Sequence, residues 1–146
     1  MSQETSTGEH GGSGGGNFDW PLPNPTWRLG WLYIKSGTYV DSIEVWWIDP
    51  SGNYYYSGRA GGPGGYGVNI PLGPGQKISR ATGRSGDLLD GLRIYDNTQS
   101  MIYQSSSFSG GNFWEEELSQ YNKTIHGFHG RSGKYVDRLG FYAYSP

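Results

Sequence analysis

One seven-residue pattern occurs three times in this chain of 146 residues, and it reads basic residue, Ser, Gly, three variable residues, Asp. The copies lie at 35–41, 84–90 and 131–137, so the pattern recurs about every fifty residues, a period typical of repeat architectures. A Gly-rich segment keeps the same period, at 11–15, 61–65 and 109–112. Because three copies fill the chain, the fold is predicted to consist of three equivalent units.

Each repeat is predicted to form a β-hairpin around its loop. A lead-in strand is expected at 31–35, 77–82 and 124–129. Apolar residues alternate after each loop, as with Ile43, Val45 and Trp47, and alternation places such residues on one face of a strand. Since one unit cannot bury that face alone, the sequence predicts an all-β protein whose three antiparallel sheets form the walls of a prism. The 26 Gly, 8 Pro and 16% aromatic residues agree with many strands joined by tight turns.

Two segments are predicted to lie outside this pattern. Residues 1–10 are polar and are expected to be disordered, which leaves 11–146 as a single domain. The segment 20–27 contains three prolines, so an extended loop that covers one end of the core is expected there.

The composition excludes several function classes. The chain has no Cys, so neither a disulfide framework nor thiol catalysis is available. Its apolar runs are too short to span a membrane, and its N-terminus has no signal-peptide pattern, so residence in the cytoplasm or export without a signal peptide is expected. The net charge is −2 and the basic residues form no stripe, which argues against a nucleic-acid partner.

The repeated loop has the chemistry of a carbohydrate site. Glycine permits a positive φ, so the chain can turn back and direct several backbone N–H groups into one small concavity. The Asp at the end of the pattern adds two carboxylate oxygens, which can accept from neighbouring hydroxyl groups. A single Gly-x-x-x-Asp is equally well explained by an Asp that caps its own turn. Three copies, each with a Gly-rich partner segment, favour ligand binding.

These residues also carry a family resemblance. From GGSGGGNFD (11–19) to GFHGRSGKYVDRLGFYA (127–143), the chain resembles the jacalin-related lectins. The three loops are more similar to members with triplicated sugar sites than to members with one site. The resemblance implies a β-prism I fold of three four-stranded antiparallel sheets with pseudo-threefold symmetry. It also implies that sugar binds at one end of the prism without a metal or cofactor.

The resemblance implies three sets of site residues, each with a carboxylate, two backbone amides and a glycine from the Gly-rich segment. The sets are Asp137 with Lys134, Tyr135 and Gly15; Asp41 with Thr38, Tyr39 and Gly65; and Asp90 with Asp87, Leu88 and Gly111.

The third set departs most from the other two. Leu88 stands where the others have Tyr39 and Tyr135, and its Gly-rich segment is shorter. The sites are therefore predicted to rank in the order Asp137, Asp41, Asp90.

The resemblance also narrows the ligand. Family members that favour galactose are cleaved so that a glycine of the first loop becomes a free N-terminus, whereas here ten residues precede Gly11. The predicted partners are therefore mannose- or glucose-containing glycans and glycoproteins, with neither nucleic acid nor a membrane as partner. A homodimer or higher homo-oligomer is expected.

Three alternatives remain open on the sequence. A glycan-active enzyme needs two carboxyl groups about 5–10 Å apart, and only the Asp90 copy has a second acid, Asp87. A metal site could use His126 and His129, but residues three apart in a strand point to opposite faces, and zinc usually requires three or four ligands. The third alternative is a protein-interaction module whose loops bind no sugar.

Overall fold

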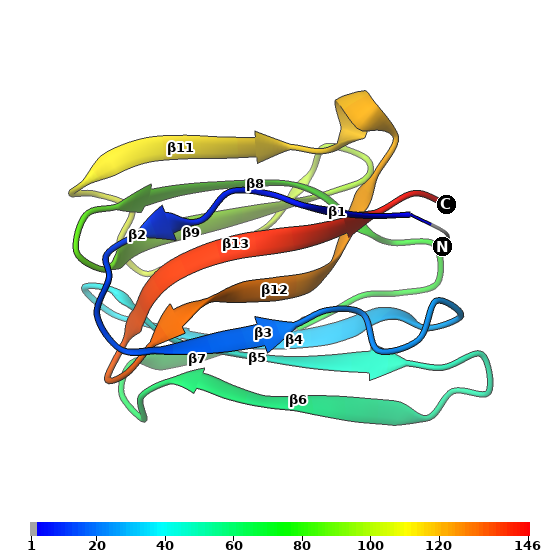
Figure 1. Cartoon of the computed structure of the whole chain (residues 1–146), viewed down its shortest axis with the longest axis horizontal. Helices are drawn as coiled ribbons and strands as arrows, with labels where there is room; N and C mark the ends of the chain where they lie inside the picture. The colour runs from blue at the N-terminus through cyan, green and yellow to red at the C-terminus, as the bar shows by residue number, and fades with distance from the viewer. Residues whose placement is uncertain (1–2) are drawn as a thin grey trace.

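The computed structural model describes residues 3–146, which form thirteen β-strands and one short 3-10 helix, η1 (Figure 1). The elements are β1 (Glu4–Ser6), β2 (His10–Gly11), β3 (Gly16–Trp20), β4 (Arg28–Ser36), β5 (Val40–Ile48), β6 (Tyr54–Gly61), β7 (Tyr66–Pro71), β8 (Ile78–Ser85), β9 (Leu89–Asp96), β10 (Met101–Gln104), β11 (Asn112–Glu117), η1 (Ser119–Tyr121), β12 (Thr124–Ser132) and β13 (Val136–Tyr144). The all-β prediction is confirmed. Within the described part of the chain, no helix is long and apolar enough to cross a membrane.

The strands form three antiparallel groups, one for each repeat. The first is a separate four-stranded sheet in the order β6-β5-β4-β7. The second runs β10-β9-β8-β11, and the third runs β3-β12-β13 with β1 and β2 paired along the outer edge of β13. A single bridge between Ile125 and Ile78 joins the second and third groups into one nine-stranded sheet.

The prediction of three separate four-stranded sheets is therefore met only in part. Ile125 and Ile78 lie at the starts of β12 and β8, and both are fully buried. Backbone groups buried this deeply are almost always hydrogen-bonded, so the starts of these two strands, which meet in the core, pair with each other. The four-stranded groups remain recognisable on either side of this bridge.

One core lies between the groups. The inner strands β5, β9 and β13 contact one another pairwise, so each repeat contributes one strand to the centre. The alternating apolar residues after the three loops are all buried there, as predicted: Ile43, Val45, Trp47, Leu92, Ile94, Leu139 and Phe141. Burial of one such side chain is worth about 1.5–3 kcal/mol, which explains why the three units fold together.

The N-terminal segment is ordered where the structure describes it. Glu4–Ser6 pairs with the end of β13, and His10 and Gly11 pair with Leu139 and Arg138. The His10 ring stacks on Trp114 at 4.4 Å, and its Nε2 lies 2.6 Å from a Glu116 carboxylate oxygen. The expectation of disorder is therefore wrong for residues 3–10, because the open edge of β13 supplies backbone partners that even a polar segment can use. Residues 1 and 2 lie outside the described residues.

The proline-rich segment forms a loop from residue 21 to residue 27, as predicted, although Trp20 belongs to β3. Leu22 is buried and its N–H donates to the Tyr144 hydroxyl at 2.7 Å. Trp27 stacks on Tyr55 with ring centroids 4.0 Å apart. This loop therefore closes one end of the core.

Candidate functional site

All three copies of the repeated pattern lie at one end of the molecule. They form the β4–β5, β8–β9 and β12–β13 turns, which Figure 1 shows at the left, opposite the two chain ends. The Gly-rich segments reach the same end because they precede β7, β11 and β3, the edge strands beside β4, β8 and β12. The register is identical in each repeat: the first residue of the edge strand pairs with the Ser of the pattern, as in Ser36–Tyr66, Ser85–Asn112 and Ser132–Gly16.

This register brings each predicted glycine against its predicted carboxylate. A Cβ placed on Gly15 would lie 3.0 Å from Asp137 Oδ1, and one on Gly65 would lie 2.5 Å from Asp41 Oδ1. The third pair is equivalent, with 2.5 Å from Gly111 to Asp90 Oδ2. The three glycines have φ angles of +72°, +90° and +55° respectively. Only glycine fits these positions without strain, and its bare backbone forms the wall that faces the carboxylate.

The turns present free backbone donors beside the carboxylates. In each turn the Gly amide donates to the carbonyl two residues later, at 2.9–3.0 Å. The two amides that follow each of these glycines donate no hydrogen bond within residues 3–146. They are the amides implied by the family resemblance: Thr38, Tyr39, Asp87, Leu88, Lys134 and Tyr135. Each site thus combines two unpaired N–H donors with one carboxylate.

The carboxylates themselves have little access to solvent. Asp41 and Asp137 are only 7% and 9% exposed, and Asp90 is half-buried. Burial raises the pKa of Asp41, although the Lys35 charge and the Gly37 amide act in the opposite direction. Burial likewise raises the pKa of Asp90, opposed by the Gly86 amide and Arg84. None of the three carboxylates forms an ion pair among the described residues, so each can still accept hydrogen bonds from a hydroxyl-rich ligand.

A set of positioning residues was missed in the interpretation of the sequence. The basic residue that opens each pattern holds the Gly-rich segment through its carbonyl groups. Lys35 Nζ lies 2.5 Å from the Pro63 oxygen, and Arg84 Nε lies 2.9 Å from that of Gly110. Arg131 donates to Gly15 at 2.7 Å and to Gly14 at 3.1 Å. The signal was present, because a basic residue occupies this place in all three copies.

The three sites are packed against one another in a ring. A Cβ on Gly62, from the Asp41 site, would lie 2.2 Å from the Lys134 carbonyl oxygen of the Asp137 site. Gly12 has the same relation, also at 2.2 Å, to the Asp87 oxygen of the Asp90 site. The ring closes where the Ser106 amide donates to Ser36 Oγ at 2.9 Å. Two of the Gly-rich segments thus support the turn of a neighbouring site, and Ser106, just before the third segment, contacts the Asp41 repeat.

The Asp90 site differs from the other two in more than its sequence. Phe108 lies against Gly91, and Gly110 has a φ of +88°, whereas its counterparts Gly14 and Gly64 have no positive φ. The other sites also share a contact that this one lacks, since the Tyr39 and Tyr135 rings meet edge-on at 5.1 Å. The predicted low rank of the Asp90 site stays a prediction.

The two histidines considered as metal ligands have separate partners. His126 Nδ1 accepts from the Leu29 amide at 2.9 Å, whereas His129 Nδ1 lies 2.6 Å from a Glu9 carboxylate oxygen. Across residues 3–146, no group of three or more His, Asp or Glu side chains is placed to hold a metal ion. Both rings instead stabilise the fold.

Sequence comparison decides the family, since the jacalin-like lectin domain matches residues 7–142. The chain belongs to the jacalin-like lectin family. Horcolin of Hordeum vulgare is 29% identical over 148 aligned positions, which cover 97% of this chain and 98% of horcolin. The fold is similar to that of Malaysian banana lectin, with a TM-score of 0.84, 23% identity, and coverage of 99% of this chain and 100% of that one. Artocarpin in its mannotriose complex gives a TM-score of 0.85 at 19% identity, with 99% of each chain covered. A mannose-binding jacalin-related lectin from Ananas comosus gives 0.80 at 22% identity, with coverage of 98% and 99%.

In this jacalin-like lectin, Gly65→Ala is expected to disrupt the Asp41 site selectively. The new methyl group would meet Asp41 Oδ1 at 2.5 Å and the Ser36 nitrogen at 2.9 Å, and the carboxylate would be displaced. Gly52→Ala is the matched control, because Gly52 has nearly the same φ, +91°, with nothing within 4 Å of the added Cβ. Both variants carry the strain of a non-Gly residue at positive φ, about 1–3 kcal/mol. Urea unfolding should show a larger loss for Gly65→Ala, and equal losses would contradict this account of the site.

Proposed function

We propose that this protein is a non-enzymatic lectin that binds mannose- or glucose-containing glycans through the Asp137, Asp41 and Asp90 sites. The observation that carries the proposal is the threefold recurrence of one arrangement: a carboxylate, two unpaired amides and a glycine wall. Such an arrangement matches a sugar ring, whose adjacent hydroxyl groups can donate to the carboxylate and accept from the amides. Membership of the jacalin-like lectin family supports carbohydrate as the ligand.

The preference for mannose or glucose rests on two further observations. The first Gly-rich segment continues from β2, whose residues His10 and Gly11 pair with β13, and an uncleaved peptide at this place is part of the proposal. Two of the structural neighbours are also described with mannose-type ligands, one as a mannose-binding lectin and one as a mannotriose complex. A β-prism I arrangement, with the three strand groups as its walls, is part of the proposal.

Each site alone is expected to bind weakly. A shallow site with a few hydrogen bonds holds a monosaccharide near the millimolar range, about −4 kcal/mol. Several sites on one end of the molecule can raise avidity for branched glycans by roughly 10²–10⁴. A homodimer or higher oligomer would add further sites and allow cross-linking.

Binding to an immobilised high-mannose glycoprotein tests the proposal. Methyl α-mannoside is expected to compete at millimolar concentrations, and methyl α-galactoside is expected to compete at least tenfold less well. Equal competition by the two sugars would overturn the mannose assignment. Binding that neither sugar disturbs would overturn the lectin proposal and favour a protein-interaction module.

A further inference from the structure

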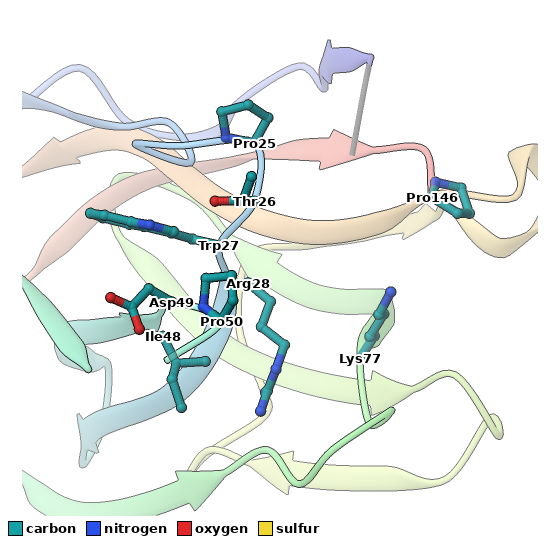
Figure 2. A pocket seen from close by; sticks show the side chains of 9 residues that line it. All are labelled: Pro25, Thr26, Trp27, Arg28, Ile48, Asp49, Pro50, Lys77 and Pro146. Atoms are coloured by element: carbon teal, nitrogen blue, oxygen red, sulfur yellow. The ribbon is translucent and has the colours of Figure 1, made fainter. Parts of the chain in front are cut away.

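A cavity lies at the end of the molecule opposite the three repeated loops. Its volume is about 470 Å³, and its walls come from the loop before β4, the β5–β6 turn, Lys77 just before β8, and Pro146 (Figure 2). β4 runs from Arg28 to Ser36 and β5 from Val40 to Ile48, so this cavity lies a full strand length away from the Asp41 site. Small-molecule sites in proteins typically measure about 300–1,000 Å³, and the cavity falls in this range.

Two half-buried cations line the cavity without counter-ions. The Lys77 ammonium makes no hydrogen bond or ion pair with any described residue. Arg28 forms no ion pair among residues 3–146 either, and its guanidinium reaches only the Leu72 carbonyl, at 3.5 Å. Both positive charges act on the core. Burial, together with the charges of Lys77 and Arg28, lowers the pKa of His126 to about 3. Cations held partly out of water without a partner favour a bound anion.

Asp49 is the one acidic side chain in the cavity wall, and its carboxylate is occupied by its own turn. Asp49 accepts from the amides of Ser51 and Asn53, from the Asn53 side chain and from the Tyr55 hydroxyl, at 2.9–3.1 Å. These hydrogen bonds, chiefly those from Asn53, lower its pKa. Figure 2 shows its carboxylate on the far side of the cavity from Lys77. Asp49 is therefore neither a partner for the two cations nor a barrier to an anion near Lys77.

Apart from Thr26, the rest of the wall is apolar, and the Trp27 ring is held in place. Trp27 stacks on Tyr55 through one face, at 4.0 Å and with 14° between the rings. Trp27 also lines the cavity, together with Pro25 and Pro50. Proline rings and a stacked indole lose little conformational entropy when a ligand packs on them, so this wall suits a flat apolar body.

We propose that this cavity is a second binding site, for a small organic anion with a planar aromatic body. The aromatic part packs beside Trp27 and Pro50, and the anionic group bonds to Lys77 and Arg28. An inorganic anion would leave the apolar wall unused, and a neutral aromatic molecule would leave both cations unpaired. The site is independent of the proposed sugar binding because the two lie at opposite ends of the strands.

The test uses 2-naphthoate as ligand, with 2-naphthamide as the neutral analogue and sodium sulfate as the simple anion. Titration of the ¹⁵N-labelled protein, followed by amide chemical shifts, is expected to give saturable changes near 25–28, 48–50 and 77. The expected Kd is on the order of 0.1–1 mM, with at least tenfold weaker binding of the amide and of sulfate. Methyl α-mannoside should not compete, so a failure of the sugar proposal would leave this result unaffected.

Two variants locate the binding. Lys77→Gln and Arg28→Gln should each weaken 2-naphthoate binding at least fivefold, and Lys77→Gln should leave the unfolding midpoint unchanged because its ammonium has no partner. Arg59→Gln is the matched control, since Arg59 is exposed on β6 and outside the cavity. Equal binding of the amide, shifts confined to the sugar loops, or no effect of either variant would each overturn the proposal.

Discussion

The combined change Asp41→Asn and Asp137→Asn is expected to reduce avidity for a high-mannose glycoprotein at least 100-fold. Each substitution keeps the shape of the side chain but removes its charge. It also places an NH₂ donor where a sugar hydroxyl has to donate. A hydrogen bond to a charged group contributes about 1.5–3 kcal/mol, so each site alone loses roughly tenfold or more. Because multivalent binding depends on simultaneous occupancy, losing two of three sites removes most of the avidity as well.

The single variants and a control distinguish the sites. Surface plasmon resonance on the immobilised glycoprotein measures avidity, and calorimetry with methyl α-mannoside measures the intrinsic sites. Asp19→Asn changes an exposed Asp of β3 outside the three turns, and it should bind like the unmodified protein. A double variant that retains full avidity would show that the Asp90 site, or a different surface, is responsible for binding.

The recurrence of one glycine and one carboxylate in each site was predictable from the sequence, because both lie in segments that keep the same period. Gly65 and Asp41 are far apart along the chain, and the family resemblance implied their pairing, as it did for Gly15 with Asp137 and Gly111 with Asp90. The structure shows why this works: the edge strand always starts opposite the Ser of the pattern, so the register carries the glycine to the carboxylate. A local sequence pattern can specify a nonlocal contact when strand pairing fixes the register.

Features that depend on free edges and on packing between repeats were not predictable in this way. The polarity of residues 3–10 indicated disorder, but the open edge of β13 and the stacking of His10 on Trp114 order this segment. The Ile125–Ile78 bridge likewise depends on how closely the starts of β12 and β8 approach each other in the core, which neither repeat encodes alone.

The role of the basic residues illustrates a different limit. Lys35, Arg84 and Arg131 recur in register, yet periodicity alone does not distinguish a residue that contacts a ligand from one that holds a loop. The hydrogen bonds to Pro63, Gly110 and Gly15 assign them to the loop. The cavity beside Trp27 was beyond sequence reasoning as well, because its walls come from three connections and from Pro146, all outside the repeated pattern.

Acid is expected to destabilise this protein through one buried histidine. The His126 side chain is 1% exposed; its Nδ1 accepts from the Leu29 amide, and its Nε2 lies 2.9 Å from the Thr124 hydroxyl. The native ring is therefore neutral, with its proton on Nε2, because a proton on Nδ1 would oppose the Leu29 N–H. Burial, together with the charges of Lys77 and Arg28, lowers the pKa of His126 from 6.5 to about 3.

The sign of the pH effect follows from this lowered pKa. Between pH 6.5 and about 3 the unfolded chain binds a proton at His126 that the native state does not bind, so the free energy of unfolding falls as the pH falls. The full contribution is on the order of 5 kcal/mol, a large share of the roughly 5–15 kcal/mol that stabilises a typical domain. His126→Asn isolates this contribution, because an Asn oxygen can still accept from the Leu29 amide and does not titrate. In urea unfolding between pH 6 and 4, the free energy of unfolding of the unmodified protein should fall by about 1.4 kcal/mol per pH unit more than that of the variant.

Carboxylates such as Asp49 and Asp96, whose pKa values are lowered by hydrogen bonds, contribute equally to both proteins and cancel in the comparison. Parallel slopes for the two proteins would mean that His126 accepts a proton without unfolding, through an opening at the Trp27 end of the core.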